Sequence, residues 1–170
     1  MRVSQLEQKA KDFATYKHEG QFRKYTGEPY IVHPQAVVEL VKSVPHTEDM
    51  VCAAWLHDTV EDTDTNISEI YYSFNVTIAY YVEMLTDLTI KSDGNRMYRK
   101  GLERRRIARA IPQIKTIKLA DLIDNTKSIV AQDSTFAKIY LKEKLLLLRV
   151  LKEGQPKLWT EANRIASVNI

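Results

Sequence analysis

Cysteine, glycine and proline are scarce in this sequence: 170 residues include one Cys, five Gly and five Pro. A single cysteine, Cys52, excludes an internal disulfide. It lies within an apolar run at residues 51–56, where we expect a buried and inert thiol, in keeping with a reducing cytoplasmic compartment. The scarcity of glycine and proline leaves long segments without a break, which favours helices.

Long apolar runs are also missing. No stretch approaches the roughly 20 apolar residues that a membrane span needs, and the N-terminal residues lack the apolar core of a signal peptide. The chain is 44% hydrophobic and 28% charged with a net charge of +3, an ordinary globular balance that does not by itself indicate duplex nucleic-acid binding. The length suits one compact domain over residues 1–170. The sequence does not predict an oligomeric state.

Apolar residues recur at helical spacing along most of the chain, and strand-like alternation is nearly absent. Gly20, the turn residues 27–29 and the polar segment 92–95 interrupt this pattern. We therefore predict an all-α bundle of about eight to ten helices. The expected helices cover about residues 4–19, 33–44, 47–60, 67–74, 77–85, 96–110, 114–130, 135–153 and 157–167.

The segment 57–62, His-Asp-Thr-Val-Glu-Asp, follows a helix that is apolar almost all the way round. Its carboxylates repel one another and are disfavoured at a helix C-terminus, whereas a bound cation would stabilise them. His57 and Glu61, like Asp58 and Asp62, are four residues apart and stack on one side of a helix. The segment indicates a metal site beside a water-activating or substrate-binding pair, with a solvated acidic helix end as the alternative.

Two further segments contain candidate functional residues. In the apolar helix at 114–130, the polar residues Lys118, Asp121 and Asn125 fall on one stripe with Asp124, which faces either a cavity or solvent. Further upstream, Arg23 and Lys24 lie on a loop before a histidine, His33, at a helix start. Two His and two Asp would give a site with mixed nitrogen and oxygen ligands, suited to Mn, Fe, Co or Zn, and the lack of thiolates argues against a closed structural zinc site.

These segments, in this order, resemble the RelA/SpoT-type HD-domain hydrolases. The matching runs are Gly27-Glu28-Pro29-Tyr30-Ile31-Val32-His33-Pro34, Ala53-Ala54-Trp55-Leu56-His57-Asp58-Thr59-Val60-Glu61-Asp62-Thr63 and Lys118-Leu119-Ala120-Asp121-Leu122-Ile123-Asp124-Asn125. A His-Asp pair alone marks the whole HD superfamily, but its combination with the Gly-Glu-Pro-Tyr segment is specific to this branch. The similarity covers roughly residues 6–148, and nothing resembles a synthetase domain. The chain therefore resembles a small stand-alone alarmone hydrolase.

The resemblance implies a divalent metal, commonly Mn²⁺, and assigns roles to individual residues. The metal would be held by His33, His57, Asp58 and Asp121. The attacking water would be activated or oriented by Glu61 and Asp62. The nucleotide would contact Arg23, Lys24, Asn125 and Ser128. The implied reaction removes the 3′-pyrophosphate of guanosine tetra- or pentaphosphate.

The chain also departs from the family pattern. The usual Ala-Asp-Arg-Leu-His-Asn run is here Ala-Asp-Leu-Ile-Asp-Asn, with Leu122 and Asp124 at the changed positions. Two alternatives therefore stay open beside the alarmone. The same site could act on another phosphorylated nucleotide, such as the 2′-phosphate of NADPH or a pyrophosphorylated tRNA end, or the chain could be a catalytically silent nucleotide-binding regulator.

The expected helix at 96–110 is strongly basic and contains one acid, Glu103. Its cations are Arg96, Arg99, Lys100, Arg104, Arg105, Arg106 and Arg109. Arginine suits bidentate contact with phosphate. This helix is a candidate surface for polyphosphate or RNA, with a solvated basic face as the alternative.

Overall fold

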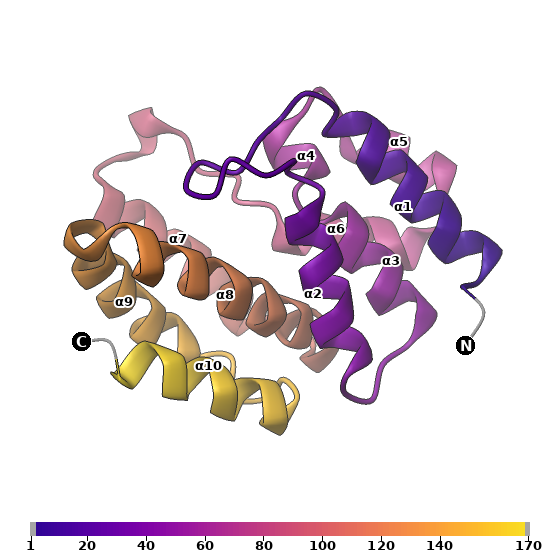
Figure 1. Ribbon diagram of the computed structural model, residues 1–170. Helices are drawn as coiled ribbons and strands as arrows, with labels where there is room; N and C mark the ends of the chain where they lie inside the picture. Colours follow the sequence, from indigo (N-terminus) through magenta and orange to yellow (C-terminus); the bar gives the residue numbers. More distant parts are fainter. Residues whose placement is uncertain (1–2, 169–170) are drawn as a thin grey trace. The chain divides into compact units, whose positions relative to one another are not determined.

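The computed structural model describes residues 3–168 (Figure 1). Over these residues the chain forms ten α-helices and one short 3₁₀ helix, and the β structure found there is an isolated bridge between Phe22 and Pro29. The all-α prediction is therefore confirmed. The chain divides into two compact units, the first ending at Thr86 and the second beginning at Asp87. The single domain over residues 1–170 stays a prediction.

The first unit is organised around α3 (Figure 1). Its helices are α1 (Gln5–Lys17), α2 (Val32–Lys42), α3 (Glu48–Leu56), α4 (Thr59–Asp62), α5 (Ile67–Ser73) and α6 (Val76–Leu85). Helix α3 packs against α1, α2 and α6, and α5 packs against α6. Every α3 residue from Met50 to Leu56 is buried, as expected for a helix that is apolar all the way round.

Polar caps start most helices of this unit. The side chains of Ser4, Thr47, Asn66 and Asn75 each accept a hydrogen bond from a backbone N–H three residues further on. Such a cap satisfies one of the donors that a helix start leaves unpaired, and it stabilises a helix by about 1 kcal/mol. The cap at Thr47 fixes where α3 begins.

The prediction of one continuous helix over residues 47–60 is wrong. Helix α3 ends at Leu56, and α4 begins at Thr59 after a turn at His57 and Asp58. The hydroxyl of Thr59 donates to the Leu56 carbonyl at 2.7 Å, and a side-chain bond of this kind competes with the helical backbone pattern. The turn separates the buried helix from the short acidic one.

In the second unit, α8 is the central helix. The elements are η1 (Lys91–Asp93), α7 (Arg96–Ala108), α8 (Pro112–Gln132), α9 (Ser134–Leu148) and α10 (Pro156–Val168). Helix α8 packs against α9 and α10, and α9 also contacts α7. The buried side of α8 includes Ile114, Ile117 and Leu119. No helix in the described part of the chain is long and apolar enough to cross a membrane.

Helix α9 ends about five residues earlier than the predicted boundary near 153. The indole Nε1 of Trp159 donates to the Leu148 carbonyl at 2.9 Å, so α10 satisfies a group that the end of α9 leaves open. Gly154 then passes close to α8, because a Cβ placed there would lie 2.7 Å from a Leu119 methyl carbon. Glycine is the residue that allows this approach.

Candidate metal centre

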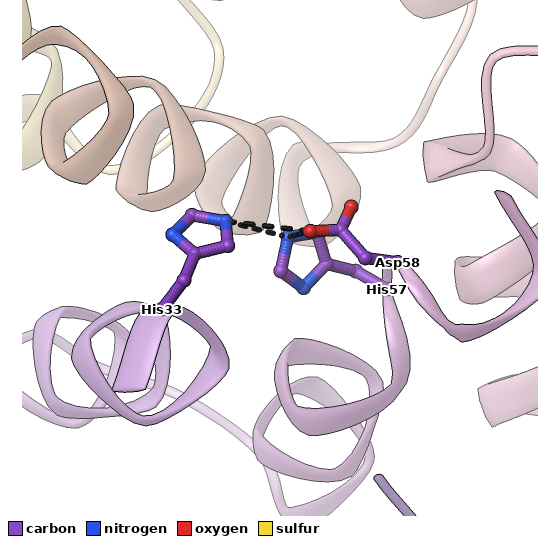
Figure 2. Close-up of side chains that lie close together, drawn as sticks. All are labelled: His33, His57 and Asp58. Atoms are coloured by element: carbon purple, nitrogen blue, oxygen red, sulfur yellow. Dashed lines mark hydrogen bonds and ion pairs between the residues drawn. The ribbon is translucent and has the colours of Figure 1, made fainter. Parts of the chain in front are cut away.

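Two histidines and an aspartate of the first unit converge on one point (Figure 2). The Nε2 atoms of His33 and His57 are 3.3 Å apart. Oδ2 of Asp58 lies 3.4 Å from Nε2 of His33 and 3.1 Å from Nε2 of His57. His33 and His57 are only 1% and 3% exposed. Three of the four predicted metal ligands therefore lie together in a largely buried cluster.

Packing of α2 against α3 sets this geometry. His33 lies in the first turn of α2, and His57 directly follows the last residue of α3. The Nδ1 atom of His57 lies 2.9 Å from the Ala54 carbonyl, and that carbonyl can only accept. Nδ1 therefore carries the proton in this contact, which leaves the lone pair of neutral His57 on Nε2, facing the cluster.

The electrostatics of the cluster suit a bound cation. Burial opposes ionisation of Asp58, but the imidazoles of His57 and His33 outweigh it and hold the pKa of that carboxyl well below its usual range. When both imidazoles are neutral, a carboxylate oxygen and the Nε2 lone pair of His57 share one small region with Nε2 of His33. A divalent ion would offset the electrostatic repulsion between these electron-rich atoms. The nitrogen and oxygen donors fit Mn, Fe, Co or Zn.

Tyr30 also joins the cluster, although its sequence context predicted no role for it. Its hydroxyl donates to Oδ2 of Asp58 at 2.6 Å and lies 3.0 Å from Oδ2 of Asp62. Burial and the nearby Asp58 raise the pKa of Tyr30 above its ordinary value, so the phenol stays protonated and keeps its donor. The one sequence signal for a role of Tyr30 is its position, three residues before His33 at the end of the Gly-Glu-Pro-Tyr run.

His18 supports Tyr30 from α1's C-terminal end and was also missed. The two rings lie 4.6 Å apart between centroids and are tilted by 31°. Nδ1 of His18 is 2.7 Å from Oε1 of Gln21, and the residue is only 3% exposed. No local pattern indicates this contact, since His18 lies outside every run that carries the family resemblance.

The predicted acid pair, Glu61 and Asp62, lies on α4. The backbone N–H of Asp62 donates to the Asp58 carbonyl at 2.9 Å, so the expected stacking of Asp62 over Asp58 is present despite the break after α3. Partial desolvation and the negative Asp58 raise the pKa of Asp62. Glu61 is exposed on the same short helix. The roles of both carboxylates in catalysis stay predictions.

Arg23 and Lys24 lie on the predicted loop, between the two residues that form the isolated bridge. The N–H of Arg23 donates to the Glu28 carbonyl at 2.8 Å. At the base of the loop, the amide of Gln21 donates to the Asp62 carbonyl at 2.8 Å. The two cations are thus carried by a loop whose base is tied to the segment that bears Asp62.

Asp121, Asn125 and Ser128 belong to α8 in the second unit. Asp121 is 7% exposed; it accepts from the Asn125 amide at 2.6 Å and pairs with Lys118 at 3.0 Å. The predicted stripe on α8 is therefore a connected polar network. Ser128 donates to the Asp124 carbonyl at 3.4 Å. That Asp121 is the fourth metal ligand, and that Asn125 and Ser128 bind substrate, stay predictions.

The same network is rich in lysines. Lys118 lies 3.5 Å from Glu103, which also pairs with Lys100 at 2.7 Å. Burial and the neighbouring Lys118 lower the pKa of Lys144, on α9, to about 8. Lys100 and Lys118 share Glu103, and each also has a carboxylate partner of its own, Asp87 for Lys100 and Asp121 for Lys118.

Comparisons with known proteins agree with this arrangement. The family described as HD domain matches residues 10–156. A guanosine-3′,5′-bis(diphosphate) 3′-pyrophosphohydrolase of Aquifex aeolicus is 40% identical over 126 residues, which are 72% of this chain and 17% of that protein. The human enzyme of the same name is 37% identical over 123 residues, which are 71% of this chain and 67% of that protein. This chain thus spans about a sixth of the Aquifex protein and two thirds of the human one.

Solved structures extend the similarity over nearly the whole chain. A structure described as a metazoan orthologue of SpoT that hydrolyses ppGpp superposes with a TM-score of 0.87 at 25% identity, covering 97% of this chain and 96% of that one. A Listeria monocytogenes protein superposes with a TM-score of 0.70 at 24% identity, covering 85% and 98%, and shows the fold alone.

Proposed function

Because this chain belongs to the HD-domain family, in its RelA/SpoT-type hydrolase branch, we propose that it is a metal-dependent hydrolase of guanosine tetra- and pentaphosphate. The reaction would release pyrophosphate from the 3′ position and leave GDP or GTP. The observation that carries the proposal is the convergence of His33, His57 and Asp58, buried and with both Nε2 atoms facing one carboxylate oxygen. Relatives with the corresponding name support the choice of substrate.

The residues have distinct tasks in this proposal. His33, His57 and Asp58 hold the ion, Asp121 supplies the fourth ligand, and Mn²⁺ is the metal we favour. When bound, a divalent ion supplies Lewis acidity that acidifies water and polarises a phosphoryl oxygen. Asp62 accepts the proton of the attacking water, and its raised pKa suits a base that works closer to neutral pH.

The remaining residues orient the reactants. The Tyr30 hydroxyl holds Asp58 and Asp62 in register. Glu61, exposed on α4, orients the attacking water. Arg23 and Lys24 pack against the nucleotide, while Asn125 and Ser128 line its pocket.

The test is a turnover screen on the chelator-treated protein with MnCl₂ restored. We expect GDP and pyrophosphate from guanosine tetraphosphate, and no turnover without metal. The His57→Ala variant should lose activity and Mn²⁺ affinity, whereas His46→Ala, which changes an exposed histidine of the same unit, should keep both. Metal binding by calorimetry and the melting temperature separate loss of the site from loss of the fold.

The same screen discriminates the alternatives. NADPH is assayed for phosphate release, and a pyrophosphorylated RNA end is assayed for pyrophosphate. Preferred turnover of either substrate would replace the alarmone proposal while leaving the metal site in place. Tight binding of guanosine tetraphosphate without turnover of any substrate would identify a silent regulator. Asp62→Asn should lower kcat by about 10²–10⁴-fold with metal affinity retained, as expected for a general base.

A further inference from the structure

The two units differ sharply in charge. Residues 1–86 contain seven Lys and Arg against thirteen Asp and Glu, whereas residues 87–170 contain eighteen against nine. The corresponding net charges, −6 and +9, account for the overall +3. A chain with one basic and one acidic unit favours a polyanionic partner for the basic unit alone. The modest overall charge conceals this division.

Five of the seven cations at residues 96–109 form two groups. The first group is ion-paired: Arg96 makes a bidentate contact with Glu143 at 2.7 and 2.8 Å, and Lys100 contacts Asp87 and Glu103 at 2.9 and 2.7 Å. Glu103 is the one acid in the sequence of α7. The acid that could neutralise the helix is therefore engaged by this ion-paired group.

The second group consists of arginines beside an aromatic ring. Tyr98, Arg105 and Arg109 are exposed, and their spacing of seven and four residues places them on one stripe. Arg104 joins from the side, since Nη2 of Arg104 and Nη1 of Arg105 each lie 3.8 Å from the position that a Cβ would take at Gly101. The two guanidinium groups thus converge over a residue without a side chain. We call Tyr98, Arg104, Arg105 and Arg109 the arginine face.

We propose that the arginine face of α7 binds single-stranded RNA, a role separate from the hydrolase function proposed above. Arginine makes planar, bidentate contacts with phosphate. Tyr98, 53% exposed, offers a ring on which a base can stack. The face extends over twelve residues from Tyr98 to Arg109, or about 16 Å of helix, enough for several nucleotides of a backbone.

The chemistry of the face favours RNA over an anionic membrane. The exposed large apolar side chains on α7 are Met97 and Tyr98, both in its first turn. Its buried positions, which include Ile107, point into the unit. A helix that lies in a membrane needs an apolar face along its length, and α7 presents cations there instead.

The test measures the affinity of the full chain for a fluorescein-labelled 20-nucleotide oligouridine by anisotropy between 50 and 200 mM KCl. A triple variant, Arg104→Gln with Arg105→Gln and Arg109→Gln, should bind at least about tenfold more weakly at 100 mM salt. Its slope of log K against log salt should fall by about 2, from roughly 0.7 for each of three lost phosphate contacts.

A matched control removes three exposed cations from α9 and α10 of the same unit. Lys138→Gln, Lys142→Gln and Lys157→Gln change the net charge equally, and the affinity should stay within about twofold of the unsubstituted chain. Melting temperatures and hydrolysis of guanosine tetraphosphate should match in both triple variants. Equal weakening in the two variants would mean a diffuse charge effect and would overturn the proposal.

Tyr98→Ala isolates the stacking contribution. We expect at least about fivefold weaker binding to the single strand with an unchanged salt slope, because a stacked base contributes affinity without neutralising a phosphate. No anisotropy change with the unsubstituted chain at 50 mM salt overturns the proposal. Capture on vesicles of phosphatidylserine and phosphatidylcholine without RNA binding also overturns it. Either result is independent of whether the chain hydrolyses nucleotides.

Discussion

The Tyr30 hydroxyl has one proton and two carboxylate neighbours, Asp58 and Asp62. It donates to Asp58 at the shorter distance, so Asp58 has the stronger contact. A partner of this kind orients a metal ligand and tunes its basicity. Because the same phenol also lies against Asp62, it links the residue proposed to hold the ion with the residue proposed to take a proton.

Replacing Tyr30 by Phe tests this link at the residue scale. The ring stacked on His18 is kept, and only the hydroxyl is lost. We expect metal affinity or kcat to fall by about 10–100-fold, the usual effect of removing such a partner. The measurement combines calorimetric Mn²⁺ titration with steady-state kinetics. Tyr72→Phe, at a residue 84% exposed, is the control, and equal kinetics of the two variants would contradict the role of Tyr30.

At the scale of elements, the turn between α3 and α4 positions the side chains of the metal cluster. It lets a buried helix end at His57, so that the imidazole meets α2 while Asp58 begins a second, solvent-facing helix. Carboxylates at the end of an apolar helix are unfavourable by themselves. The break moves Glu61 and Asp62 off α3 and leaves His57 to be fixed by the Ala54 carbonyl.

Replacing glycine by alanine should change the stability of the chain in opposite directions at Gly154 and Gly101. A Cβ at Gly154 would meet a Leu119 methyl carbon at 2.7 Å and the Lys115 backbone at 3.1 Å. Gly154→Ala should therefore destabilise the chain by about 1–3 kcal/mol, as overpacking does. A Cβ at Gly101 would meet only the ends of two arginines at 3.8 Å, and Gly101→Ala should stabilise the helix by roughly 0.5–1 kcal/mol.

Urea unfolding at pH 7 measures both effects. The two variants carry the identical chemical change within one unit, so differences in the denatured chain are matched. The prediction fails if Gly154→Ala is as stable as the unsubstituted protein, because the close approach to α8 would then have relaxed without cost.

At the scale of the whole molecule, metal binding should appear as thermal stability. An ion that binds only the folded chain stabilises it by about 2.7 kcal/mol at a free concentration of 100 times Kd. For a protein of this size that corresponds to a rise in Tm of roughly 5–10 °C. Calorimetric scans with Mn²⁺ and with excess chelator measure the shift.

The His33→Ala variant provides the control for this linkage. It should melt at the same temperature with and without Mn²⁺, because it lacks a buried nitrogen of the cluster. A shift as large as that of the unsubstituted chain would place the stabilising ion elsewhere. Scanning each variant in chelator first separates the effect of the substitution on the fold from its effect on metal binding.

The sequence by itself determined the all-α class, most helix positions and the residues of the cluster. Helical periodicity and caps act over a few neighbouring residues, so they can be read locally. His33, His57 and Asp58 were predicted because their residue types and spacing suit a metal. The boundary near 60 was wrong because the Thr59 hydroxyl competes with the backbone at a single position.

Only the tertiary structure decided which side chains complete the metal cluster. It also decided which cations of α7 are exposed. Tyr30 meets Asp58 and Asp62 across long separations in the chain, and His18 packs against the Tyr30 ring; no local pattern encodes such contacts. The basic helix likewise has one composition but two faces. Arg96 and Lys100 form ion pairs with Glu143 and Asp87, while Arg105 and Arg109 are exposed, because the partners of each cation depend on what packs against the helix.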